Sequence, residues 1–287
     1  MSRTDRLRLA VPNKGRLLEP TMRLLDDAGL ALETSPRLLV ARAEAAPIDV
    51  LAVRTEDIVE LVADGAADLG VTGLDLLVES GAELEALLEL GFGRCRLEAA
   101  VPSDAAARDL AALDGSRLAT SHPETARRFF AGRDIAVELV PMTGSVEVAP
   151  RLALADGIVD LVATGSTLTA NGLRSVGSLL ESQAVLVGRP AAQPHDGLVG
   201  DLLAMLGAVV AGRRRKYLMM NAPQAALADI QGILPGLDSP SVIPLAHPGH
   251  VAVHAVVGAD EVWGVLPRLR EAGATGILVM PIEKLLA

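Results

Sequence analysis

Hydroxyl-bearing side chains are concentrated in one short segment, residues 164–169, which reads TGSTLT. Gly165 allows the backbone to turn sharply and to approach a ligand closely. Ser166, Thr167 and Thr169 supply hydroxyl donors. A helix is predicted to begin in this segment, and the N–H groups and positive dipole end of a helix start favour an anion such as phosphate.

Two carboxylates precede this segment, at Asp156 and Asp160. Carboxylate oxygens accept hydrogen bonds from sugar hydroxyls, so the whole stretch suits a ribose 5-phosphate. The alternative is an ordinary helix N-cap with turn residues and no ligand, because short Gly/Ser/Thr motifs have low specificity.

A second loop with possible chemistry is PNKGR, residues 12–16, where Lys14 and Arg16 flank Gly15 after a predicted strand. Two cations beside a flexible backbone suit a polyphosphate, although a solvated basic turn is the simpler alternative. Arg37 and Arg54 also follow strand-like segments, and surface salt bridges are the alternative for both.

Two further acids have two possible roles each. Asp75, in TGLD, could cap a helix or accept a hydrogen bond from a base amine. Glu147, in TGSVE, could be a carboxylate favoured by a helix dipole or a contact to ribose. No Cys/His cluster has zinc spacing, and neither a Walker A motif nor G-x-G-x-x-G occurs.

Length and composition limit the class of protein. The chain has 287 residues, half of them hydrophobic, which favours two or three domains with large aliphatic cores. A net charge of −10 argues against a broad nucleic-acid surface. A single cysteine, Cys95, suits a reducing compartment, and no stretch is apolar enough to cross a membrane. We expect a soluble, cytoplasmic protein.

An internal repeat gives the layout of the elements that position these loops. Residues 63–76 (ADGAADLGVTGLDL) and 155–168 (ADGIVDLVATGSTL) agree at eight of fourteen positions. Each copy lies in a block where strands alternate with helices, which predicts two α/β lobes with parallel-rich sheets. Ligands of such sheets bind beyond the carboxyl ends of the strands, so the polar loops should line a cleft. We also expect one helix over residues 146–157.

The last 75 residues predict a separate small domain. A helix-like run (197–212) and the basic cluster RRRK (213–216) precede a β-α-β-β-α-β order, which is typical of ferredoxin-like modules. The sheet edges of such modules often pair with a neighbour, so we expect oligomers.

Taken together, these segments resemble the ATP phosphoribosyltransferase family. The resemblance is carried by PNKGRLLEPT, DVLAVRTEDI, GAADLGVTGLDLL, GFGRCRL, the long segment from GSVEVAPRL to TGSTLTANGL, YLMMNAP and GILVMPIEKL, and it extends from about residue 7 to 286. ALADG replaces the more usual GLADA, which removes no functional group. The C-terminal module makes the chain similar to the long form, which needs no separate regulatory subunit.

The resemblance implies a fold and a reaction. It implies two lobes like those of type II periplasmic binding proteins, covering residues 1–97 with a return segment at 183–212, and 98–182, followed by an ACT-like, ferredoxin-like regulatory domain at 213–287. The reaction joins ATP to 5-phosphoribosyl 1-diphosphate (PRPP) with Mg²⁺, in dimers and inhibited hexamers. The alternatives are a two-lobed binding protein without catalysis and a non-catalytic amino-acid sensor.

The resemblance also implies roles for individual residues. Arg16, Arg37, Glu147 and Asp160 would be catalytic. The 5-phosphate and ribose of PRPP would be held by Asp160, Thr164, Gly165, Ser166, Thr167, Leu168 and Thr169. ATP and phosphates would lie against Lys14, Gly15, Arg16, Arg54 and Asp75. Histidine, as feedback inhibitor, would bind at Asn221, Leu237, Ser239, Ser241, Val256 and Gly276.

Overall fold

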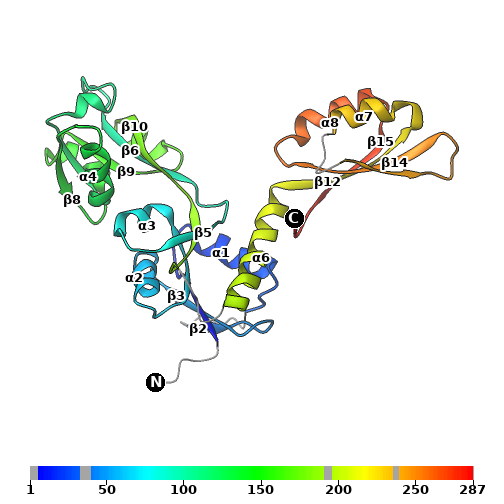
Figure 1. The fold of residues 1–287 in the computed structure, drawn as a ribbon. Helices are drawn as coiled ribbons and strands as arrows, with labels where there is room; N and C mark the ends of the chain where they lie inside the picture. The colour runs from blue at the N-terminus through cyan, green and yellow to red at the C-terminus, as the bar shows by residue number, and fades with distance from the viewer. Residues whose placement is uncertain (1–5, 33–39, 191–195, 235–238, 287) are drawn as a thin grey trace. The chain divides into compact units, whose positions relative to one another are not determined.

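The structure is a computed structural model that describes residues 6–32, 40–190, 196–234 and 239–286. Its internal contacts divide the chain into two units. The first comprises Met1–Asp26 and Leu30–Val199, and the second comprises Asp27–Gly29 and Gly200–Ala287. The first unit holds two sheets and the second holds one (Figure 1).

The first sheet of unit 1, with its helices, is lobe I. Its strand order is β2-β3-β1-β4-β11-β5. β1 is parallel to β3 and β4, whereas β11 is antiparallel to β4 and β5. The sheet is therefore mixed, whereas the sequence pattern predicts a mainly parallel one. The elements are β1 (Leu7–Pro12), α1 (Leu18–Asp27), β2 (Val40–Arg42), β3 (Ile48–Val53), η1 (Thr55–Asp57), α2 (Ile58–Ala63), β4 (Leu69–Gly73), α3 (Leu74–Ser80), β5 (Glu85–Glu89) and β11 (Ala184–Gly188).

The second sheet, with its helices, is lobe II and has the strand order β10-β6-β9-β7-β8. β7 runs parallel to β8 and β9, and β6 runs antiparallel to β9 and β10. Phe130 of α4 and Leu118 of β7 pack in its core. The elements are β6 (Cys95–Pro102), η2 (Ala111–Leu113), β7 (Arg117–Thr120), α4 (Pro123–Ala131), β8 (Glu138–Pro141), η3 (Val146–Val148), η4 (Pro150–Leu152), β9 (Gly157–Val162), α5 (Ser166–Ala170) and β10 (Leu173–Ser182).

The helix predicted over residues 146–157 is absent, and two short 3-10 helices, η3 and η4, stand in its place. Pro150 lacks the N–H that a continuing α-helix would use at this point. Ser145 and Ala153 adopt left-handed backbone angles, with φ of 51° and 53°, on either side of the pair. The sequence pattern shows the apolar periodicity but not these two breaks.

The chain passes between the lobes twice, through residues 90–94 and through Gln183. The first passage is hydrogen-bonded to the residue that follows the second: Leu90 N–H donates to Ala184 O at 3.0 Å, and Ala184 N–H donates to Phe92 O at 2.9 Å. Leu74 N–H, at the start of α3, donates to Gln183 O at 2.9 Å. The start of α3 is thus anchored to the segment that joins the lobes.

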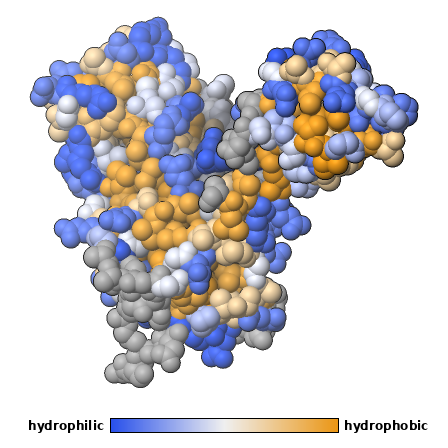
Figure 2. Space-filling view, turned by 45° about the vertical axis from the view of Figure 1, so that its right-hand side comes forward, coloured by the Kyte–Doolittle hydropathy of each residue, from blue (hydrophilic) through white to orange (hydrophobic). Residues whose placement is uncertain are grey.

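Unit 2 is the β-α-β-β-α-β module that the sequence predicts, and its four strands are antiparallel in the order β13-β14-β12-β15. Leu218, Val253 and Leu269 are central to its core. Apolar side chains also gather on the visible surface of this unit (Figure 2). Exposed apolar residues of the unit include Leu278 and Met280 of β15. The elements are α6 (Asp196–Arg213, shared with unit 1), β12 (Arg215–Pro223), η5 (Gln224–Ala226), α7 (Leu227–Ile233), β13 (Ser241–Pro244), β14 (His250–Gly258), α8 (Val262–Glu271) and β15 (Thr275–Pro281). None of the helices in the described ranges is long and apolar enough to cross a membrane.

Candidate active site

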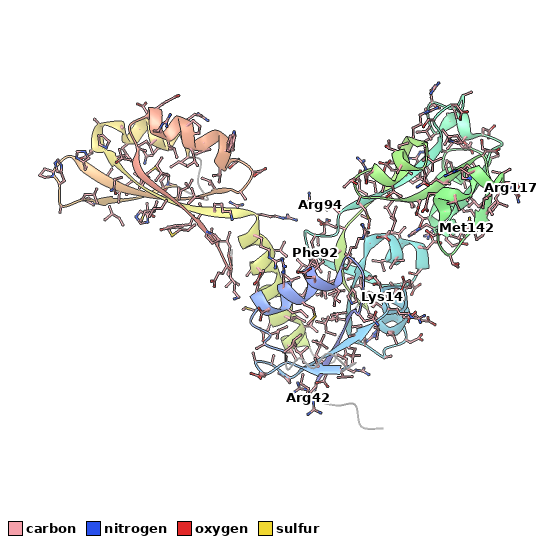
Figure 3. The ribbon with its side chains drawn as sticks, turned by 180° about the vertical axis from the view of Figure 1, so that it is seen from behind. Lys14, Arg42, Phe92, Arg94, Arg117 and Met142 are labelled. Carbon is pink, nitrogen blue, oxygen red and sulfur yellow. The ribbon has the colours of Figure 1, made fainter. Side chains whose placement is uncertain are left out.

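A cavity of about 510 Å³ lies within unit 1, at the carboxyl ends of strands from both lobes. This is where the alternation of strands and helices predicts a ligand site. In Figure 3, Lys14 follows β1 of lobe I, Met142 follows β8 of lobe II, and Phe92 and Arg94 lie in the passage between them. The lining residues are Lys14, Gly15, Arg16, Leu17, Thr55, Glu56, Gly73, Asp75, Leu76, Ser121, His122, Met142, Thr143 and Leu161.

The basic loop after β1 reaches this cavity because its backbone turns at Gly15, where φ is 79°. Lys14 and Arg16 are exposed there. The Arg16 Nη2 atom lies 3.0 Å from the Sγ atom of buried Cys95. Gly93 has φ of 65°, a left-handed angle that favours glycine, and a Cβ at this position would lie 2.3 Å from Leu17 Cδ2. The sequence motifs KGRL and GFGRC are therefore in contact.

Asp75, in the first turn of α3, is 3% exposed and connects the two lobes. Its Oδ1 accepts a hydrogen bond from Ser182 at 2.5 Å, and its N–H donates to Ser182 Oγ at 3.0 Å. Its Oδ2 lies 3.4 Å from Nε2 of His122, a buried atom that makes no hydrogen bond to any of the described residues. Burial raises the pKa of Asp75, but the nearby His122 imidazole and the hydrogen bond from Ser182 outweigh burial and hold the pKa below its ordinary value.

His122 is the main residue that sequence reasoning did not assign to the site. It is 4% exposed, follows β7, lines the cavity, and shares a hydrogen bond of 2.9 Å between its Nδ1 and Ser121 Oγ. The sequence signal was its position in a polar loop after a strand. That signal alone could not separate a structural histidine from one at the site.

The TGSTLT segment forms the predicted turn and helix start. Gly165 has φ of 80° and precedes α5, Thr164 Oγ1 and Ser166 Oγ are 2.9 Å apart, and Thr169 Oγ1 donates to Gly165 O at 3.2 Å. In the first copy of the repeat, residues 63–76, the equivalent Gly73 has an extended backbone with φ of −80°. The second copy alone makes the left-handed turn, although α3 and α5 begin at equivalent positions of the repeat.

The predicted site residues do not all lie on one cavity surface. Lys14, Gly15, Arg16 and Asp75 do, whereas residues 164–169 are absent from the lining, to which β9 contributes Leu161. Arg54 is exposed at the start of η1 and is not among the lining residues either. Arg37 and Leu237 lie outside the described residues.

In lobe II, Asp160 and Glu147 are close enough for their negative charges to interact. Burial raises the pKa of Asp160, and the negative charge of Glu147 raises it further. The Leu161 N–H donates to Asp160 Oδ1 at 2.8 Å and lowers the pKa in part. A ligand that donates hydroxyl groups to both acids would relieve their mutual repulsion.

A dedicated metal cage is not found: no group of three or more His, Cys, Asp or Glu within the described ranges is arranged to hold an ion. Mg²⁺ commonly binds through substrate phosphates and one or two carboxylates. The cationic loop and the exposed, cavity-lining Glu56 are compatible with an ion that arrives on a polyphosphate.

In unit 2, Asn221 and Gly276 lie together: a Cβ at Gly276 would be 3.8 Å from Asn221 Nδ2. Ser241, at the start of β13, pairs with His254 of β14, and Val256 of β14 pairs with Tyr217 of β12. Val256 also lines a separate cavity of about 420 Å³ with Arg214 and Arg215. Ser239 lies just before β13.

Comparison with known proteins gives matches along nearly the whole chain. The family model described as ATP phosphoribosyltransferase matches residues 54–208, and the model of the HisG C-terminal domain matches 212–284. An ATP phosphoribosyltransferase of Gemmatimonas aurantiaca is 46% identical over 98% of this chain and 99% of its own length. One from Maricaulis maris is 43% identical over 99% of this chain and 100% of its own.

A solved structure is also similar. The chain in the ATP phosphoribosyl transferase (HisG:HisZ) complex from Thermotoga maritima has a TM-score of 0.62 and 28% identity. The match covers 98% of that chain but 71% of this one. With the two family models in succession and relatives aligned from end to end, this chain belongs to the ATP phosphoribosyltransferase family.

Proposed function

We propose that the protein transfers the 5-phosphoribosyl group of PRPP to N1 of ATP, giving phosphoribosyl-ATP and pyrophosphate, the first step of histidine biosynthesis. The observation that carries this proposal is the cavity of unit 1, where cationic Lys14 and Arg16 from lobe I face Ser121 and His122 from lobe II. The family membership supplies the substrates, ATP and PRPP.

The chemistry needs positioning more than proton transfer. The adenine N1 lone pair forms a bond to the anomeric carbon, and the bond from that carbon to the pyrophosphate oxygen breaks with its electrons leaving on pyrophosphate. Positive charge builds on the ribose and negative charge on the leaving group. Fixed cations beside the leaving group and acceptors beside the ribose hydroxyls therefore stabilise the transition state.

Each lobe supplies one part of that electrostatic arrangement. Lys14 and Arg16, with Arg37 and Arg54 as further candidates, would neutralise phosphate oxygens. Glu147 and Asp160 would hold the ribose hydroxyls, and residues 164–169 would hold the 5-phosphate through hydroxyls and the first N–H groups of α5. Asp75 would lie near the adenine. Mg²⁺ would enter with PRPP and neutralise part of the pyrophosphate charge.

The second part of the proposal concerns control. We assign catalysis to residues 1–97 with 183–212 and to 98–182, and regulation to 213–287. Histidine would bind in unit 2 near Asn221 and Gly276, the adjacent pair on β12 and β15. The Thermotoga maritima protein is in complex with HisZ. This chain has its own segment matching the HisG C-terminal domain, so we propose control within a homo-oligomer, in the cytoplasm where ATP and PRPP are made.

The test is ultraviolet absorbance of a mixture of protein, ATP, PRPP, Mg²⁺ and pyrophosphatase, with and without histidine. We expect a phosphoribosyl-ATP signal that histidine suppresses. Arg16→Ala should abolish most of the signal, whereas Arg23→Ala, which removes an exposed arginine of α1 paired with Glu19, should not. Binding of PRPP by calorimetry without any signal would instead favour a two-lobed binding protein.

A further inference from the structure

The first turn of helix α4, in lobe II, is capped by a side chain from lobe I. Both oxygens of the Glu79 carboxylate, in α3, accept hydrogen bonds from that turn. Glu124 N–H donates to Oε1 at 2.8 Å, Thr125 N–H donates to Oε2 at 2.8 Å, and Thr125 Oγ1–H donates to Oε2 at 2.7 Å. Arg128 adds a hydrogen bond to Val78 O.

Helix α4 has no such cap of its own. His122, at the N-cap position, makes no side-chain cap hydrogen bond, and Pro123 at the first helical position has no N–H to offer. The imidazole of His122 faces Ser121 and Asp75 instead. Since the first N–H groups of a helix need acceptors and its dipole favours a negative charge, the Glu79 carboxylate meets both needs.

This contact continues directly into the cavity. Asp75 and Glu79 are four residues apart on α3, so they lie on the same face of the helix, one turn apart. Asp75 faces His122 just before α4, and Glu79 faces the first turn of α4. A shift of Glu79 relative to α4 would therefore move Ser121 and His122, which line the cavity, relative to Asp75.

We propose that Glu79 is a positioning residue for substrate binding. It holds the lobes at the separation that forms the cavity, by capping α4 from the opposite lobe. The arrangement of the lobes can be tested without any catalytic readout. Only the kinetic part rests on the proposed function.

The direct test is the distance between spin labels on the two lobes, measured by pulsed electron paramagnetic resonance. Glu60→Cys on α2 and Ala131→Cys at the end of α4 place the labels at exposed positions. Native Cys95 is buried, and a sample without introduced cysteines checks that it takes no label. We expect a longer or broader distance distribution with Glu79→Ala and no change with Glu83→Ala, an exposed acid just after α3. An unchanged distribution in Glu79→Ala would overturn the proposal.

The second test is the split between KM and kcat. Glu79→Ala should raise the KM for PRPP about tenfold, or about 1.4 kcal/mol, with kcat changed less than threefold. Glu79→Gln keeps one acceptor oxygen and should restore part of the loss, and Thr125→Val, which deletes one donor, should cause a smaller rise. A lower melting temperature with KM unchanged would mean a purely structural role. If the wild-type protein lacks transferase activity, the proposed function fails while the spin-label result still decides the role of Glu79.

Discussion

Replacing Asp75 by alanine tests the connection between the lobes by stability alone. The substitution leaves the buried Ser182 hydroxyl without its acceptor, and it removes the carboxylate that lies 3.4 Å from Nε2 of buried His122. A buried polar group without a partner costs about 1–3 kcal/mol. The hydrogen bond from Ser182 is short, at 2.5 Å, whereas the His122 contact is long, at 3.4 Å. We therefore assign the loss of the His122 contact a cost of about 1 kcal/mol, the low end of this range. We expect a loss of about 3 kcal/mol.

The assay is thermal unfolding followed by circular dichroism. For a unit of this size, 1 kcal/mol corresponds to roughly 2–4 °C, so Asp75→Ala should lower the midpoint of unit 1 by about 9 °C. Asp75→Asn keeps an oxygen for the Ser182 hydroxyl and should lose about half as much. The control is Glu56→Ala, an exposed acid on the same cavity, which should stay within about 0.5 kcal/mol of wild type.

The pH dependence has a definite sign. The pKa of Asp75 is lowered in the folded state, so the stabilisation by its carboxylate is fully present above the unfolded pKa, about 3.9, and is lost as pH falls through the folded value. The stability gap between wild type and Asp75→Asn should therefore be constant above about pH 5 and shrink below about pH 4. A gap that persists unchanged into acid, or an Asp75→Ala midpoint equal to wild type, would refute the reasoning.

Three further predictions follow from individual positions. Thr167→Asp puts a carboxylate in the α5 turn and should abolish PRPP binding in calorimetry, whereas Thr167→Ser should bind normally; unchanged affinity in the aspartate variant would remove the loop from the site. Gly70→Ala should cost about 1–3 kcal/mol in chemical denaturation, because its Cβ would lie 2.4 Å from Ile58 Cγ2 and 3.0 Å from Val62 Cγ2; a neutral result would mean that α2 moves freely. Arg37→Ala should lower kcat more than it weakens ATP binding, and a loss confined to binding would leave Arg37 a positioning role.

The sequence predicts those elements whose own residues show a strand or helix periodicity. The strands β1, β3 and β9 and the helices α4 and α8 have the expected periodicity, and Gly165 makes the turn that its position after a strand implied. The alternation of strands and helices does not predict β5, β6, β10 or β11. Glu85–Glu89 and Cys95–Pro102 carry charged residues within short apolar segments, so their pattern alone identifies neither.

In the candidate site, too, the sequence predicts the residues that have a local signal and misses the contacts between distant residues. The cationic loop at residues 14–16 and Asp75 were predicted to be functional from neighbouring residues, and they do line one cavity. The contacts of Asp75 with Ser182 and His122, and of Glu79 with α4, join residues 45 to 107 positions apart. A single sequence holds no local signal for such pairs, so neither the partner of Asp75 nor the role of His122 could be predicted from it.

The order of strands in lobe I has a consequence for synthesis on the ribosome. Among the described strands, β5 pairs with β11 alone, and β11 begins at Ala184, about 95 residues after β5 ends at Glu89. β11 begins about 110 residues after β4 ends at Gly73, so at roughly 5–20 residues per second β4 keeps an unpaired edge for about 6–22 s while the contiguous lobe II emerges and folds. All five residues of β4 are buried in the finished sheet, so this unpaired apolar edge needs protection from aggregation until β11 has been made.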